Sequence, residues 1–131
     1  KPPLGFFRDF VLISSGENKS TMDLKHNAIA PIVDLARIYA LALGIDANST
    51  LERLQAAKGS HILSKQAGRS LIAAYEFLIQ LRLELNALQI QQQKKPSNFL
   101  SPKDISRLQR SHLKDAFRVI KELQDSRQVV Y

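Results

Sequence analysis

Apolar residues between positions 28 and 43 point to nearly every side of a helix. This pattern predicts a central helix that packs against neighbours on several sides. Gly44 follows the last apolar residue and suits a helix C-terminus. Pro31 is tolerated only in the first turn, so the regular part of the helix is expected to begin near Ala30.

Capping motifs predict the starts of three further helices. Ser49 and Glu52 form a capping box, and a second box pairs Ser106 with Gln109. Ser64 can cap the longest helix, which fades into a run of glutamines after position 88. The predicted helices span residues 50–58, 65–88 and 107–125, and residues 126–131 are expected to fray.

Two of these helices carry sustained apolar stripes, typical of bundle helices rather than of a zipper seam. In the long helix the stripe alternates steps of four and three, and in the last helix it includes a histidine. The stripe of the long helix is Ala67, Leu71, Ala74, Leu78, Leu81, Leu85 and Leu88, widened by Ile72, Ile79 and Leu83. The stripe of the last helix is Leu108, His112, Ala116, Val119 and Leu123, broadened by Leu113 and Ile120.

Ahead of the helices, residues 4–13 and 21–26 flank a Ser/Gly/Asn-rich turn, which predicts a β-hairpin. The alternative is a short helix followed by a loop. In the second strand Asp23 and Lys25 would share one face. We therefore expect an all-α, antiparallel bundle of four to five helices with a short N-terminal hairpin or extended segment. Residues 1–27 would form that segment and residues 28–131 the bundle, in one domain.

Composition narrows the classes of function. The chain of 131 residues has no cysteine, which excludes disulfides and thiolate metal sites. Its net charge of +7 favours phosphates, nucleotides or an acidic partner. The basic residues are spread over several helices, so nucleic acid is not favoured. The longest apolar run is interrupted by charges and is too short to span a bilayer. The start at Lys1 suggests a piece of a longer cytoplasmic protein.

Known catalytic motifs do not occur. The sequence lacks a Gly-rich phosphate loop, a G-x-S-x-G elbow, an H-E-x-x-H helix and a D-x-D pair for two metals. We therefore expect no catalytic residue and no metal ligand in this chain.

Several polar residues are candidates for binding. Asp34 and Arg37 are the only charges in the central helix, and they form either a structural ion pair or an anion site with Arg37 at its centre. His112 is either a core histidine or a ligand. Asp23 and Lys25 form either an exposed pair or a grip for phosphate and hydroxyl groups.

Three segments together resemble a known bacterial family. They are MDLKHNAIAPIVDLARIYAL (residues 22–41), EFLIQLRLELNALQ (residues 76–89) and SHLKDAFRVIKELQ (residues 111–124). In this order they are similar to the "putative nucleotidyltransferase substrate-binding domain", a C-terminal helical domain. Its typical parent also carries a cyclic-nucleotide-binding-like domain, CBS domains and a nucleotidyltransferase domain similar to protein-PII uridylyltransferases.

The resemblance implies that chemistry occurs upstream, with Mg²⁺ and a nucleoside triphosphate as cofactors of that catalytic domain. This chain would help to position nucleotide or acceptor. The alternative is a regulatory or homodimerising module with no substrate contact. The resemblance implies nine substrate-binding residues: Asp23, Lys25, Asp34, Arg37, Arg82, His112, Lys114, Asp115 and Arg118.

Overall fold

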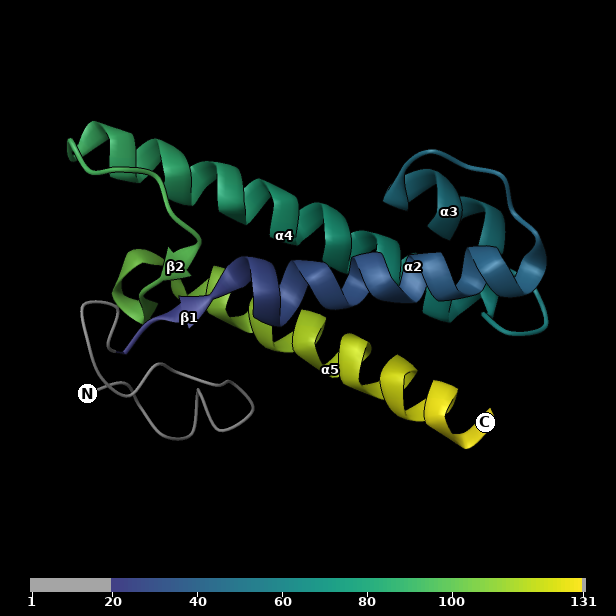
Figure 1. The fold of residues 1–131 in the computed structure, drawn as a ribbon. Coiled ribbons are helices and arrows are strands. Elements are labelled where there is room, and N and C mark those ends of the chain that lie inside the picture. The colour runs from purple at the N-terminus through teal and green to yellow at the C-terminus, as the bar shows by residue number, and fades with distance from the viewer. Residues whose placement is uncertain (1–19, 131) are drawn as a thin grey trace.

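The computed structural model of the chain describes residues 20–130, with side chains as far as Ser126. Figure 1 shows a helical bundle in which α4 and α5 pack directly against each other, α2 lies across them in contact with α5, and α3 lies against α2 and the start of α4. The predicted all-α bundle is therefore confirmed. The elements are β1 (Met22–Asp23), the π-helical turn η1 (Lys25–Ile29), α2 (Ala30–Leu43), α3 (Thr50–Ala57), α4 (Lys65–Gln91), β2 (Phe99–Leu100), the 3-10 turn η2 (Pro102–Asp104) and α5 (Arg107–Val130).

The core lies where α2, α4 and α5 face one another. Ile32 and Leu35 of α2, Leu78 of α4 and Leu113 of α5 are almost completely buried. Met22 and Leu24 belong to the same cluster, so the segment that precedes the helices contributes to the core. Burying each such side chain stabilises the fold by about 1.5–3 kcal/mol.

The strand at Met22–Asp23 pairs with Phe99–Leu100 in an antiparallel ladder, with Met22 opposite Leu100. The Leu24 N–H extends this ladder by donating to the Asn98 carbonyl at 2.8 Å. The expected first strand, residues 4–13, lies outside the described residues. The expected second strand is shorter than predicted, because a helical turn begins directly after Asp23.

The regular helix α2 begins at Ala30, as predicted, but a π-helical turn that was not predicted precedes it. The Asp23 carboxylate accepts a hydrogen bond from the His26 N–H at 3.1 Å and so caps the new turn. The turn is π-helical, since the Ala30 N–H donates to the carbonyl of Lys25, five residues back. Pro31 offers a reason: its ring would clash with the carbonyl four residues back in a regular α-helix. Lys25 consequently lies on a helical turn and does not share a strand face with Asp23.

The predicted caps are confirmed. The Ser49 and Ser64 hydroxyls each accept a hydrogen bond from the third following N–H, at 3.1 Å. Ser106 and Gln109 make both bonds of a capping box, at 2.9 and 3.1 Å. Gly44 ends α2 in the left-handed conformation, with φ 68°.

Three residues of the predicted apolar stripes are exposed. Leu108 is 66% exposed and His112 is also exposed, whereas Leu113, Ala116 and Ile120 of the same predicted stripe are buried. Next to Leu108, the Gln109 side chain turns toward α4 and donates to Glu84 at 2.8 Å. Leu83 was expected in the α4 stripe but is 59% exposed.

The last helix is also longer than predicted. It continues to Val130, beyond the expected end at residue 125. No glycine or proline follows Asp125, so nothing in the sequence stops the helix there.

Candidate functional site

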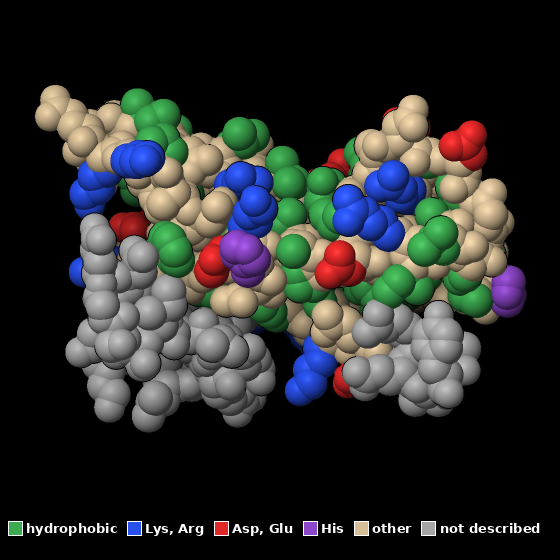
Figure 2. All heavy atoms as spheres, viewed as in Figure 1, with side chains coloured by type: hydrophobic (Ala, Val, Ile, Leu, Met, Phe, Trp, Pro, Cys, Tyr) green, Lys and Arg blue, Asp and Glu red, His purple; other side chains and the backbone are tan. Residues whose placement is uncertain are grey.

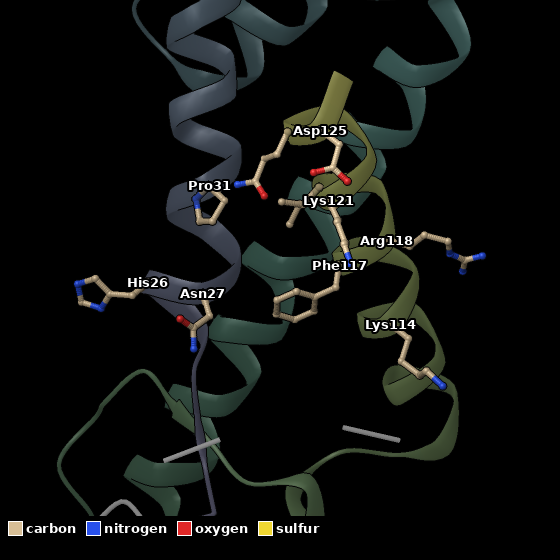
Figure 3. A pocket seen from close by; sticks show the side chains of 10 residues that line it. His26, Asn27, Pro31, Lys114, Phe117, Arg118, Lys121 and Asp125 are labelled. Carbon is tan, nitrogen blue, oxygen red and sulfur yellow. The ribbon is translucent and has the colours of Figure 1, made fainter. Parts of the chain in front are cut away.

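A groove of about 1080 Å³ runs between the η1–α2 junction and α5. Figure 3 shows Asn27 and Pro31 on one wall and Phe117 and Lys121 on the other. The π turn positions Asn27, and the regular helix α5 positions the opposite wall at steps of three and four residues. The lining residues are His26, Asn27, Pro31, Lys114, Phe117, Arg118, Ile120, Lys121, Gln124 and Asp125.

The charge of the groove is mainly positive. Lys114, Arg118 and Lys121 line the α5 wall, and Asp125 is the one carboxylate among the lining residues. Arg118 and Lys114 extend toward the outer side of α5 in Figure 3, whereas Lys121 lies beside Phe117. The arrangement favours an anion, because ammonium and guanidinium groups bind phosphate oxygens by charge-assisted hydrogen bonds.

Arg118 also forms an ion pair with Asp115 on its own helix. Both side chains are more than half exposed. Exposed pairs of this kind stabilise proteins by at most about 1 kcal/mol. An incoming phosphate can therefore compete with Asp115 for the guanidinium.

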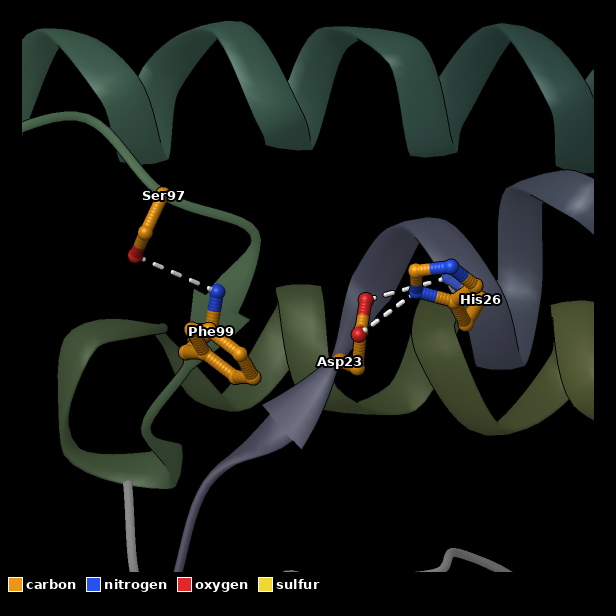
Figure 4. A network of polar contacts seen from close by, with 4 residues as sticks. All are labelled: Asp23, His26, Ser97 and Phe99. Atoms are coloured by element: carbon orange, nitrogen blue, oxygen red, sulfur yellow. Dashed lines mark hydrogen bonds and ion pairs between the residues drawn. The ribbon is translucent and has the colours of Figure 1, made fainter. Parts of the chain in front are cut away.

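Asp23 and His26 form the second polar contact of the site, at the groove's edge (Figure 4). The His26 Nδ1 lies 2.7 Å from Asp23 Oδ2, and the imidazole is largely exposed. Burial raises the pKa of the Asp23 carboxyl, but hydrogen bonds from the His26 backbone and ring, and the ring's charge, outweigh burial and lower it. Asp23 therefore fixes the orientation of the imidazole through its Nδ1 side.

The predicted binding residues fall into separate regions. Lys114 and Arg118 line the groove, and Asp23 reaches its edge through His26. His112 packs edge-on against Phe77, with ring centroids 5.4 Å apart, and shares a shallower hollow with Asp115. Figure 2 agrees, showing Lys and Arg side chains in separate groups over one face.

The other predicted residues lie farther from the groove. Arg37 lines a small hollow with Arg53, between α2 and α3. Asp34 and Arg37 are both exposed, and no ion pair joins them among the described residues. Lys25 is exposed and Arg82 is half-buried, and neither lines the hollows described above.

Sequence reasoning did not select His26, Asn27, Phe117 or Lys121 as candidate residues. Their proximity depends on how α2 crosses α5, which no local pattern reveals. A signal did exist for Lys121, because it continues the three- and four-residue steps of Lys114 and Arg118.

Within residues 20–130, no cluster of three His, Asp or Glu side chains could hold a metal ion. In the same part of the chain, every helix is too short or too polar to cross a membrane.

The described residues form a helical bundle with a groove whose α5 wall is mainly basic. The family described as "putative nucleotidyltransferase substrate binding domain" matches residues 1–131. The chain belongs to this family, which confirms the resemblance of its three segments. Neither the curated proteins nor the solved structures gave a match.

Proposed function

We propose that this chain is the substrate-holding domain of a multidomain nucleotidyltransferase whose chemistry is performed by a separate domain. Membership of the family supports the general role. The proposal includes the wider context implied by the sequence resemblance: a uridylyltransferase-like catalytic domain that uses Mg²⁺ and a nucleoside triphosphate.

The observation that carries the proposal is the groove with Lys114, Arg118 and Lys121 on one wall. Its volume of about 1080 Å³ slightly exceeds the range of roughly 300–1,000 Å³ that is usual for ligand sites. The three cations would bind phosphate oxygens of the nucleotide. Phe117 and Asn27 would contact its base, the first through its ring and the second through its amide. At the edge of the groove, Asp23 would hold the His26 ring in place through its contact with Nδ1.

Calorimetric titration with ATP and with UTP tests this role. The double variant Arg118→Gln/Lys121→Gln should weaken binding at least about tenfold, because each charged hydrogen bond contributes about 1.5–3 kcal/mol. The matched control, Lys65→Gln/Arg69→Gln, removes the same charge from exposed positions at the start of α4. Equal affinities of the two double variants for both nucleotides would contradict the proposed role of the groove.

A second candidate function is the regulatory or homodimerising module. Leu83 and Ile90 are 59% and 61% exposed and lie seven residues apart on α4, hence on one face. A partner helix could cover them. Sedimentation equilibrium distinguishes the two functions. If the wild-type chain has the mass of a monomer at every protein concentration, and the variant Leu83→Ser/Ile90→Ser has the same mass, the dimer is excluded.

A further inference from the structure

The positive wall of the groove is part of a longer row of basic residues on α5. With 100° between successive residues, five cations fall within an arc of about 80° on the helix surface. The row extends for roughly 21 Å at 1.5 Å per residue. Its members are Arg107, Arg110, Lys114, Arg118 and Lys121.

The row lies on an accessible flank of α5. Leu113, Ala116 and Ile120 face the core, whereas Arg107, Arg118 and Lys121 are exposed and Arg110 and Lys114 are half-buried. Arg110 and Lys114 also take part in other interactions of the chain. Asp125, beyond Lys121, is the first carboxylate in the same arc.

The length of the row identifies the kind of partner. A nucleotide in the groove would reach Lys114, Arg118 and Lys121, whereas Arg107 and Arg110 are not among the residues that line the groove. An acidic protein helix would need a continuous apolar stripe beside its charges, but the positions on this arc are all polar and Phe117 is a single aromatic ring at its edge. A strand of nucleic acid needs only a line of cations for its backbone and an aromatic ring for a base, and Phe117 lies beside the row.

We propose that the row from Arg107 to Lys121 binds the phosphate backbone of a single-stranded nucleic acid, whose terminal nucleotide enters the groove. This inference rests on the proposed function and names the substrate class as a nucleic-acid acceptor. The sequence disfavoured this partner because the basic residues are spread over several helices. Five of them nevertheless lie on one side of the single helix α5.

The test is the salt dependence of binding to a fluorescein-labelled oligouridylate of 12 nucleotides, followed by anisotropy with the 131-residue chain. Each phosphate contact in a single strand contributes about 0.7 to the slope of log K against log salt. Five contacts predict about 130-fold weaker binding at 200 mM than at 50 mM KCl. The variant Arg107→Gln/Lys121→Gln lacks the cations at both ends of the row and keeps three contacts. Its affinity should therefore fall only about 20-fold over the same range of salt.

The matched control, Lys65→Gln/Arg69→Gln, should keep the full salt dependence, and circular dichroism should show all three proteins folded. No binding at 50 mM KCl, or one slope for both double variants, would overturn the inference. Oligoglutamate that carries the same number of charges as the RNA should not displace the RNA. If it does, the inference is overturned, because the row then binds acidic polypeptides. ATP binding without RNA binding would sink this inference alone, and RNA binding without ATP binding would contradict the nucleotide groove instead.

Discussion

Gly68 lies directly against Lys58, where α3 ends beside the first turns of α4. A Cβ atom on Gly68 would meet the Lys58 Cγ at 2.6 Å, its Cβ at 2.8 Å and its Cα at 3.2 Å. Such distances require the end of α3 to move, because Cβ and Cα cannot shift without the backbone. The absence of a side chain at position 68 therefore sets the approach of α3 to α4.

Gly68→Ala should consequently destabilise the domain. Overpacking costs about 1–3 kcal/mol, whereas the better helix propensity of alanine returns about 1 kcal/mol. We expect a net loss of about 1 kcal/mol in the free energy of unfolding, measured with urea. A Lys58→Gly background removes the contacts with Cγ and Cβ and leaves only the 3.2 Å contact with Cα, so the same substitution should cost less there. A stabilising effect in the wild-type background would show that the contact is not close.

The cap at Asp23 predicts a second effect on stability. Asp23→Ala removes the acceptor for the His26 N–H and should cost about 1 kcal/mol, the usual value for a lost N-cap. His26→Ala is the matched control, because it keeps the backbone hydrogen bond and loses only the ring contact. Equal losses in the two variants would mean that the ring contact, and not the cap, stabilises this turn.

The lowered pKa of Asp23 predicts how its contribution varies with pH. The folded-state pKa lies below the ordinary value of 3.8, so the unfolded chain binds the proton more readily. The stabilisation by the carboxylate is complete above the unfolded pKa and is lost as pH falls through the folded pKa. Asp23→Asn keeps a capping acceptor without the charge. The difference between wild-type and variant unfolding free energies should therefore shrink below about pH 4, and a constant difference from pH 7 to pH 2 would contradict this.

Removing the charge of Asp115 should raise the affinity of the chain for ATP. Asp115 competes with ligand phosphates for Arg118 in an exposed ion pair. Asp115→Asn should change stability by less than about 0.5 kcal/mol and tighten ATP binding about two- to fivefold, in line with the small energy of exposed pairs. Weaker ATP binding in this variant would show that the carboxylate itself contacts the ligand.

Local sequence signals predicted most of the helical framework. Ser49, Ser64 and Ser106 act within three residues of their own positions, so their caps can be inferred without knowing the fold. The ladder between Met22–Asp23 and Phe99–Leu100 could not be inferred, because the two strands are separated by most of the chain. The exposure of Leu108 and His112 was missed for a similar reason, because it depends on where α5 meets α4, which the periodicity of a single helix does not show.

The candidate site was predictable only in part. Lys114 and Arg118 were expected one turn apart on one helix, and both line the groove. Asn27 and Phe117 meet across the groove only because a π turn precedes α2 and places that wall opposite α5. His112 looked like a core residue because helical periodicity places it in the stripe, yet its ring lies at the surface against Phe77.

The most direct test of the account is an NMR titration of the isotopically labelled chain with ATP. If ATP binds in the groove, the backbone amide signals of His26, Asn27 and residues 114–121 of α5 should change their chemical shifts together as ATP is added. The chemical shifts of two amides away from the groove should not change. These belong to Arg37, in the hollow between α2 and α3, and to Lys94, in a separate hollow beside the end of α4. Shifts confined to those other hollows, with none at the groove, would contradict the claim that this groove holds the substrate.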